Sequence, residues 1–172
     1  DKQCEVVFND ARATALGKPD HGWAEVAKLV QRAAVAKSVE MVGGAQQVVE
    51  MSVAYAKERV QFDKPIASFQ AIQHHCANMA LNVDTARLLA YQAAGKMTDG
   101  EPCDSEAAMC KAWASDAYQR VAMLGHQVHG AIGFTHHIGL WGDIEPCPGI
   151  QLAKDSIYDG RSLPEIFSDS AF

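Results

Sequence analysis

The sequence predicts an all-α protein, an up-down-up-down four-helix bundle that is preceded by one residual strand. Three observations lead to this fold class. Apolar residues recur at steps of three and four over three long segments. Alanine is abundant and strand formers are few, in a chain of 172 residues of which 48 % are hydrophobic. The connections between the segments are short, which favours antiparallel packing of neighbouring helices.

The first part of the chain differs from the rest. Residues 4–13 have the composition of a strand, with Val-Val-Phe at its centre. A lone strand is not stable without a partner. We therefore expect residues 1–20 to be the end of a preceding β-domain and a linker, residues 21–160 to form the helical bundle, and residues 161–172 to be a tail. The abrupt start of the sequence suggests a piece of a longer protein.

The first helix is predicted over residues 21–61, with Asp20 as its N-cap. Two adjacent glycines, Gly43 and Gly44, lie inside it and each cost about 1 kcal/mol of helix propensity. Such a pair indicates close approach of another helix or of a ligand, or a kink. The apolar stripe of this helix is Val42, Ala45, Val49, Val53, Ala56 and Val60.

A second helix is predicted over residues 67–97, and a third over residues 104–128 with Asp104 or Ser105 as its cap. Residues 130–149 are expected to be irregular, and a short fourth helix is expected near Ile150. The stripe of the second helix is Ile72, Cys76, Met79, Val83, Ala86, Leu89 and Ala93. The stripe of the third is Ala107, Cys110, Ala114, Ala117, Val121, Leu124 and Val128.

Composition narrows the classes of function. The formal charge of −6 argues against nucleic acid or an anionic membrane surface as a partner. No apolar run approaches the roughly 20 residues that span a bilayer. The five cysteines are scattered and form no CxxC pair, so they indicate reduced thiols. His126 and His129 have the spacing of metal ligands on a helix, but no carboxylate-x-x-His repeat accompanies them and no metal site is predicted.

The corner between the first two helices is the most informative segment. It reads YAKERVQFDKPIASFQ over residues 55–70 and holds an Arg, two Phe and two Gln around a proline turn. The guanidinium of Arg matches the geometry of a phosphate, and Phe offers a face for stacking on a flat ring. The same residues could also simply cap and staple two helices, and composition alone favours that simpler explanation.

The amino-acid sequence of this corner resembles the flavin-binding corner of the acyl-CoA dehydrogenase family, which usually reads Y-x-x-x-R-x-x-F-G-x-P-[IL]-x-x-x-Q. A second stretch, QVHGAIGFT over residues 127–135, resembles the family's signature Q-[VL]-H-G-[GA]-x-G-[FY]. The two stretches occur in the family's order and at about its spacing. The resemblance covers residues 4–160 and only the later part of a family member.

This resemblance implies that the chain contacts FAD. In the family, Arg59 would lie on the pyrophosphate, Phe62 on the adenine portion, and Gln70 would donate a hydrogen bond to the cofactor. Gln127, Gly130 and Ala131 would lie against the adenosine diphosphate moiety. A helix C-cap followed by a turn is the structural alternative for the second stretch. Asp63 stands where the family usually has Gly, and an acid beside a pyrophosphate is unfavourable unless it points away or pairs, for example with Lys64.

The resemblance also implies a reaction in which a carboxylate removes the proton α to a thioester and the flavin accepts a hydride from the β-carbon. One family position for this base falls at Ala33 or Ala34, and neither can act. The other position resembles Tyr-Asp-Gly at residues 158–160, so Asp159 is the candidate base, with an ordinary Asp-Gly turn as the alternative. Glu145 and Glu40 are the fallback candidates.

The implied partners are an acyl-CoA substrate, an electron-transfer flavoprotein or similar acceptor, and further copies of the chain in a dimer or tetramer. The implied compartment is the bacterial cytoplasm or the mitochondrial matrix. Because the segments that cradle the flavin ring are missing, this piece alone is not expected to turn over substrate. Two alternatives remain open: a non-catalytic bundle that supplies FAD contacts and an oligomer interface, and an acidic helical interaction module.

Overall fold

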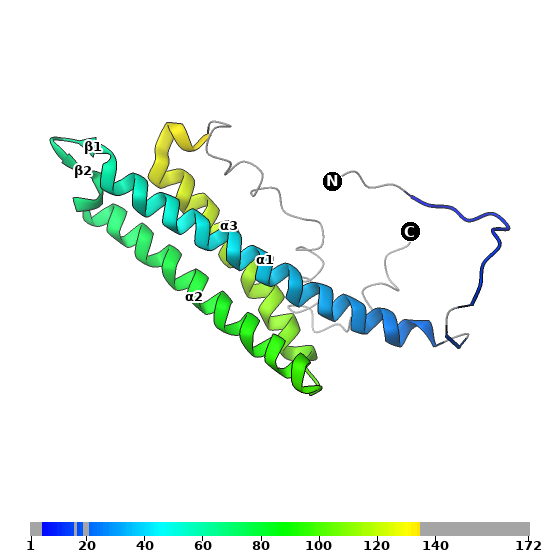
Figure 1. Ribbon diagram of the computed structural model, residues 1–172. Coiled ribbons are helices and arrows are strands. Elements are labelled where there is room, and N and C mark those ends of the chain that lie inside the picture. The colour runs from blue at the N-terminus through cyan, green and yellow to red at the C-terminus, as the bar shows by residue number, and fades with distance from the viewer. Residues whose placement is uncertain (1–4, 16, 19–20, 135–172) are drawn as a thin grey trace.

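The computed structural model describes residues 5–15, 17–18 and 21–134, and three long helices account for most of them. These are α1 (Gly22–Glu58), α2 (Gln70–Asp99) and α3 (Asp104–His129) (Figure 1). The shorter elements are β1 (Val60–Gln61), β2 (Lys64–Pro65), the 3-10 turn η1 (Ile66–Ser68) and the 3-10 turn η2 (Gly130–Phe134). The all-α class is confirmed, while the fourth helix expected near Ile150 lies outside the described residues.

Helices that follow each other in the chain run antiparallel, so α1 and α3 are parallel, and α3 packs against both α1 and α2 (Figure 1). The C-terminus of α1, the N-terminus of α2 and the C-terminus of α3 therefore meet at one end of the bundle. At the other end Gly100 closes α2 in the left-handed conformation, with φ of 71°. A glycine adopts this conformation without the steric cost that a Cβ would bring.

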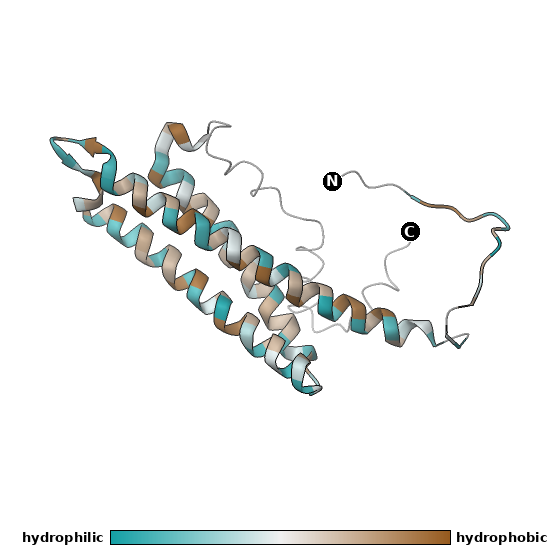
Figure 2. Ribbon diagram, in the orientation of Figure 1, coloured by the Kyte–Doolittle hydropathy of each residue, from teal (hydrophilic) through white to brown (hydrophobic). Residues whose placement is uncertain are grey.

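Small residues dominate the core, so the helices approach closely. The predicted stripes of α2 and α3 are confirmed: Met79 and Val83 on α2 and Cys110 and Val121 on α3 are at most 1 % exposed. Apolar residues also lie on the outward faces of the helices (Figure 2), and Leu81, with 67 % of its surface exposed, is one of them.

The predicted stripe of α1 is confirmed at Ala45 and Ala56 and wrong at its other positions, three of which lie one residue after a buried position. Val42, Val49 and Val53 are only half-buried, and Val60 is exposed. The buried face contains two serines, which a pattern of apolar residues cannot detect although their small side chains fit between closely packed helices. That face consists of Val35, Ser38, Met41, Ala45, Val48, Ser52 and Ala56.

Two glycines set the distance between α1 and α3. A Cβ on Gly125 would lie 2.5 Å from Val48 Cγ1, and a Cβ on Gly44 would lie 3.0 Å from the Tyr118 ring. The predicted close approach of another helix is therefore found at Gly44. Its neighbour Gly43 has nothing within 4 Å of the Cβ position and is exposed.

The predicted element boundaries need correction at the corner. Helix α1 ends at Glu58, because Val60–Gln61 pairs with Lys64–Pro65 instead of continuing the helix. Helix α2 begins at Gln70, because Ile66–Ser68 form a 3-10 turn. The start of the predicted irregular region, Gly130–Phe134, is likewise a 3-10 turn.

The predicted caps and the predicted strand also differ from the structure. Cys103 is the N-cap of α3, and the carboxylate of Asp104 instead accepts a hydrogen bond of 3.0 Å from Gln31 on α1. Asp20 lies outside the described residues. Residues 5–13 form no strand, and Phe8 is 79 % exposed, because no neighbouring strand in the described part of the chain pairs with them.

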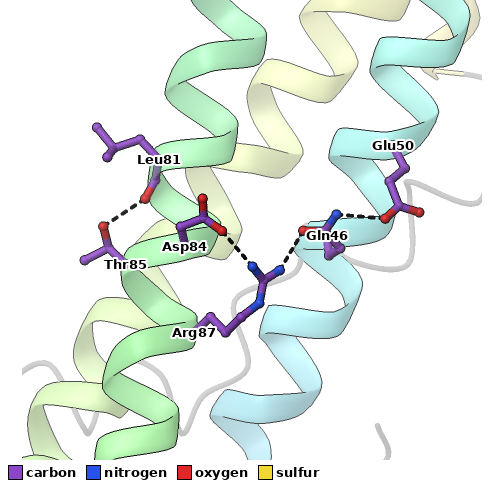
Figure 3. A network of polar contacts seen from close by, with 6 residues as sticks. All are labelled: Gln46, Glu50, Leu81, Asp84, Thr85 and Arg87. Atoms are coloured by element: carbon purple, nitrogen blue, oxygen red, sulfur yellow. Dashed lines mark hydrogen bonds and ion pairs between the residues drawn. The ribbon is translucent and has the colours of Figure 1, made fainter.

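Polar side chains link the helices outside the core. Arg87 of α2 donates to Asp84 at 2.6 Å and to Gln46 of α1 at 2.7 Å, and Gln46 donates to Glu50 at 2.7 Å (Figure 3). This network ties the middle of α1 to the middle of α2. Among the helices described, none is long and apolar enough to cross a membrane.

Candidate cofactor site

The end of α1 brings Arg59 to the root of the β1–β2 hairpin. Arg59 is the C-cap of α1, and its N–H donates to the carbonyl of Tyr55 at 2.8 Å. The carbonyl of Arg59 accepts a hydrogen bond of 2.8 Å from the N–H of Ile66, across the base of the hairpin. The backbone of Arg59 is thus held on both sides, while the residue is exposed to solvent.

The hairpin turns through Phe62 and Asp63, which both have positive φ, 53° and 61°. A two-residue connection with two positive φ values has the form of a type I′ turn, which favours Gly, Asn and Asp. The backbone therefore explains both the glycine usual at position 63 in the resembling family and the tolerance of Asp63 here.

The tip of the hairpin presents an aromatic ring. Phe62 is 87 % exposed, and its ring meets that of Phe69 edge-on, with centroids 6.0 Å apart. The ammonium of Lys64 lies 4.4 Å from the centroid of the Phe69 ring, as in a cation–π contact. Phe69 is the N-cap of α2, so Gln70 begins that helix and is exposed beside the hairpin.

The last turn of α3 carries the second signature. Gln127 is exposed, and Gly130 ends the helix with φ of 63° and ψ of −137°, a conformation suited to glycine. Ala131 is exposed on the following turn, η2. Gly133 packs back on the helix, because a Cβ there would lie 2.9 Å from the carbonyl oxygen of His126.

Two buried histidines lie near the end of α3, and one of them holds the turn. Nδ1 of His126 lies 2.7 Å from the carbonyl oxygen of Gly133, and Nδ1 of His129 lies 2.8 Å from that of Gly125. The ring of His129 also stacks on Tyr55 of α1, at 4.7 Å between centroids and 28° between planes. In the sequence these histidines show only the spacing of metal ligands. Their place on the buried face of α3 is the signal that could have revealed a structural role.

The predicted cofactor residues are brought together at one end of the bundle (Figure 1). They come from the end of α1, the hairpin, the start of α2 and the end of α3, and all are exposed. The N-terminus of α2 lies at the same end and adds the positive end of a helix dipole, which, like the guanidinium of Arg59, favours an anion. These residues are Arg59, Phe62, Gln70, Gln127, Gly130 and Ala131.

Of the candidate bases, the structure describes Glu40, which lies away from this end. Asp159 and Glu145 lie outside the described residues. Glu40 is exposed in the middle of α1, with one carboxylate oxygen 2.9 Å from Lys37, and lies about 28 Å along the helix from Arg59. Ala33 is exposed and Ala34 is half-buried near the start of the same helix.

Two other features involve none of these residues. Burial raises the pKa of the Cys76 and Cys110 thiols, so both are weak nucleophiles suited to filling space. A shallow groove of about 440 Å³ follows α1 alone, with Val49 and Val53 among its lining residues.

Comparison with known proteins identifies the chain. The family model "Acyl-CoA dehydrogenase, C-terminal domain" matches residues 20–143. A 3-(aryl)acrylate reductase of Clostridium sporogenes is 37 % identical over 123 residues, which are 72 % of this chain and 33 % of that protein. The chain spans about a third of the length of the curated relatives it matches.

Solved structures share the fold. Butyryl-CoA dehydrogenase from Megasphaera elsdenii superposes with a TM-score of 0.74 at 27 % identity, covering 88 % of this chain and 38 % of that chain. The FAD complex of PigA superposes with a TM-score of 0.62 at 26 % identity, covering 72 % and 34 %. The match to the family model therefore shows that the chain belongs to the acyl-CoA dehydrogenase family and corresponds to the C-terminal domain of a family member.

Proposed function

We propose that this chain is the cofactor-binding C-terminal domain of a flavin-dependent acyl-CoA dehydrogenase. The whole protein would oxidise the Cα–Cβ bond of an acyl-CoA thioester and pass a hydride to FAD. One observation carries the proposal: the Arg59 corner and the segment after Gln127, far apart in sequence, present their exposed groups at the same end of the bundle.

The residues at this end fit the diphosphate and adenine half of FAD. Arg59 and the N-terminus of α2 would hold the pyrophosphate, because both favour negative charge. Phe62 offers an accessible ring on which adenine could stack. Gln70 and Gln127 would supply hydrogen bonds, and Gly130, which lacks a side chain, would let the backbone approach the ligand.

Bound FAD would supply the hydride acceptor, and this chain would supply binding and the base. Asp159 is proposed to remove the α-proton, because the sequence Tyr-Asp-Gly at residues 158–160 resembles the turn that carries the base in the family. Glu145 is the alternative. Glu40 is a weaker choice, since it is exposed and paired with Lys37 far from the cofactor end. A base of this kind needs a dry pocket that raises its pKa.

The same proposal includes partners. An acyl-CoA is the substrate, and an electron-transfer flavoprotein or a similar acceptor would reoxidise the flavin. Exposed apolar residues on α2 and α3, among them Leu88 and Met123, support a homo-oligomer in which they are covered. The free thiols of Cys76, Cys103 and Cys110 fit a reducing compartment, the bacterial cytoplasm or the mitochondrial matrix.

A non-catalytic subunit that only supplies FAD contacts is the second candidate. It is favoured by Ala33 and Ala34, which stand where one group of family members would carry the base. The cofactor end would serve this role equally well, so flavin binding alone cannot separate the two functions.

An anaerobic titration of the full-length protein separates them. Acyl-CoA esters from butyryl to long-chain length should bleach the flavin absorbance of the enzyme, whereas the non-catalytic subunit would keep its absorbance. Asp159→Asn should abolish bleaching and leave FAD bound, with Asp99→Asn at the far end of α2 as the control. Bleaching that persists in Asp159→Asn would exclude this residue as the base.

Arg59→Gln tests the cofactor site itself. Losing a charge-assisted hydrogen bond should weaken FAD binding by roughly 10- to 100-fold. Arg32→Gln is the matched control, because Arg32 is an exposed arginine on the same helix. Equal FAD affinity in both variants would contradict the proposed site.

A further inference from the structure

Helices α1 and α3, whose ends lead into two groups of the proposed cofactor residues, touch through an aromatic pair. Tyr55 of α1 and His129 of α3 stack with their ring centroids 4.7 Å apart. The carbonyl of Tyr55 accepts the hydrogen bond from the N–H of Arg59, one helical turn further on. The stack therefore sets the position of α3 relative to the backbone that carries Arg59.

A second contact fixes the turn that follows α3. Nδ1 of His126 lies 2.7 Å from the Gly133 carbonyl oxygen, and His126 is only 4 % exposed. Because a carbonyl oxygen can only accept, Nδ1 of the ring carries the proton and donates it. The missing side chain of Gly133 lets η2 fold back to this distance.

We infer that Tyr55, His126 and His129 form a brace that holds the 130–134 turn at a fixed position relative to Arg59. The inference rests on the proposed function, because the two segments held by the brace are those that would grip the ends of one FAD diphosphate. The brace residues are positioning residues: His126 and His129 are buried and contact protein groups.

Preorganisation is the physical basis of this role. When a dinucleotide binds two flexible segments, part of the binding free energy is spent on ordering them. If the segments are already ordered in the free protein, this cost is absent and the affinity is higher. The hydrogen bond of His126 orders the turn, and the stack of Tyr55 on His129 orders the two helix ends. Each contact should thus contribute to FAD affinity without touching the cofactor.

Paired variants of the full-length protein test the brace. His126→Leu keeps the bulk and loses the donor, whereas His126→Asn places an amide N–H close to the position of Nδ1. We expect His126→Leu to raise the FAD dissociation constant about tenfold, the value of one buried hydrogen bond, and His126→Asn to restore most of that affinity. His74→Leu, at an exposed histidine of α2, is the control and should bind as the parent does.

A second pair tests the stack. Tyr55→Phe keeps the ring and should retain FAD affinity, while Tyr55→Leu should weaken it. At saturating FAD, all variants should give the visible flavin spectrum of the parent, since the brace lies at the diphosphate end and not at the flavin ring. Melting temperatures of the FAD-free proteins report folding separately.

The outcomes are distinct. Weaker FAD binding in the Leu variants, rescue by Asn and Phe, and an unchanged spectrum support the brace. Unchanged FAD affinity in the Leu variants, or a loss that Asn and Phe do not rescue, overturns it while the proposed function stands. If the parent protein binds no FAD, the proposed function is overturned, and so is the inferred role of the brace.

Discussion

Gly125 shows how one absent side chain sets the packing of two helices. Its Cβ position lies 2.5 Å from Cγ1 of Val48, which is 3 % exposed and cannot move aside easily. We expect Gly125→Ala to lower the free energy of unfolding by about 1–3 kcal/mol, as overpacking does. Urea unfolding curves measure this change.

Gly43 is the matched control, because it is a helical glycine of α1 with nothing within 4 Å of its Cβ position. Gly43→Ala should raise the free energy of unfolding by about 0.5–1 kcal/mol through helix propensity alone. If Gly125→Ala raises the free energy of unfolding as Gly43→Ala should, the assigned contact between Gly125 and Val48 is wrong.

The two sequence motifs predict Arg59, Phe62 and Gln127 as cofactor residues through residue type and spacing. The structure brings these residues to one end of the bundle, and their contact with FAD stays a prediction. The roles of His126 and His129 were missed, because a spacing of three fits metal ligands and core residues equally well. Only the fold shows that each Nδ1 faces a backbone carbonyl.

An ion pair joins the far ends of α2 and α3. Lys96 and Glu106 lie 2.5 Å apart, and the hydrogen bond from Lys96 lowers the pKa of Glu106 below its ordinary value of 4.5. Because the folded pKa is depressed, the pair stabilises the fold above about pH 4.5, and this contribution is lost as the pH falls through the folded pKa.

Glu106→Gln tests this pair. The free energy of unfolding of the variant should fall less steeply than that of the parent as the pH drops below 4.5, the ordinary pKa of the carboxyl group. Glu40→Gln breaks an exposed pair within one helix and should change stability little. Denaturation from pH 7 to pH 3 measures both, and parallel curves for the parent and Glu106→Gln would contradict the assignment.

At the scale of elements, the sequence predicted the helices better than their edges. Strict steps of three and four on α3 gave the apolar part of its buried face. An apolar pattern cannot detect the polar residues that are also buried there, Lys111, Ser115, His126 and His129. The stripe of α1 was predicted only in part: Ala45 and Ala56 are buried as expected, but Ser38 and Ser52 also occupy core positions and half-buried valines flank them. The end of α1 was missed because the pairing of Val60 with Pro65 depends on the hairpin turn.

At the scale of the whole molecule, the proposed cofactor site and the connection between α2 and α3 lie at opposite ends of the bundle. The hairpin and η2 lie at the proposed cofactor end, and the connection through Gly100 lies at the opposite end (Figure 1). Inserting Gly-Ser after Glu101 should leave FAD affinity of the full-length protein unchanged, because long connections cost little free energy. The same insertion between Phe62 and Asp63 should weaken FAD binding, as measured by flavin titration. Equal effects would contradict a site confined to one end.

The unequal lengths of the helices have a further consequence. The hydrogen bond between Gln31 and Asp104 marks where α3 begins alongside α1, so residues 22–30 of α1 extend beyond α3 by about 14 Å. Trp23, Val26 and Leu29 are exposed on this overhang. Protection of backbone amides against deuterium exchange should therefore decline steadily from the level of Val48 towards Gly22, and α1 melts from its first turn inward.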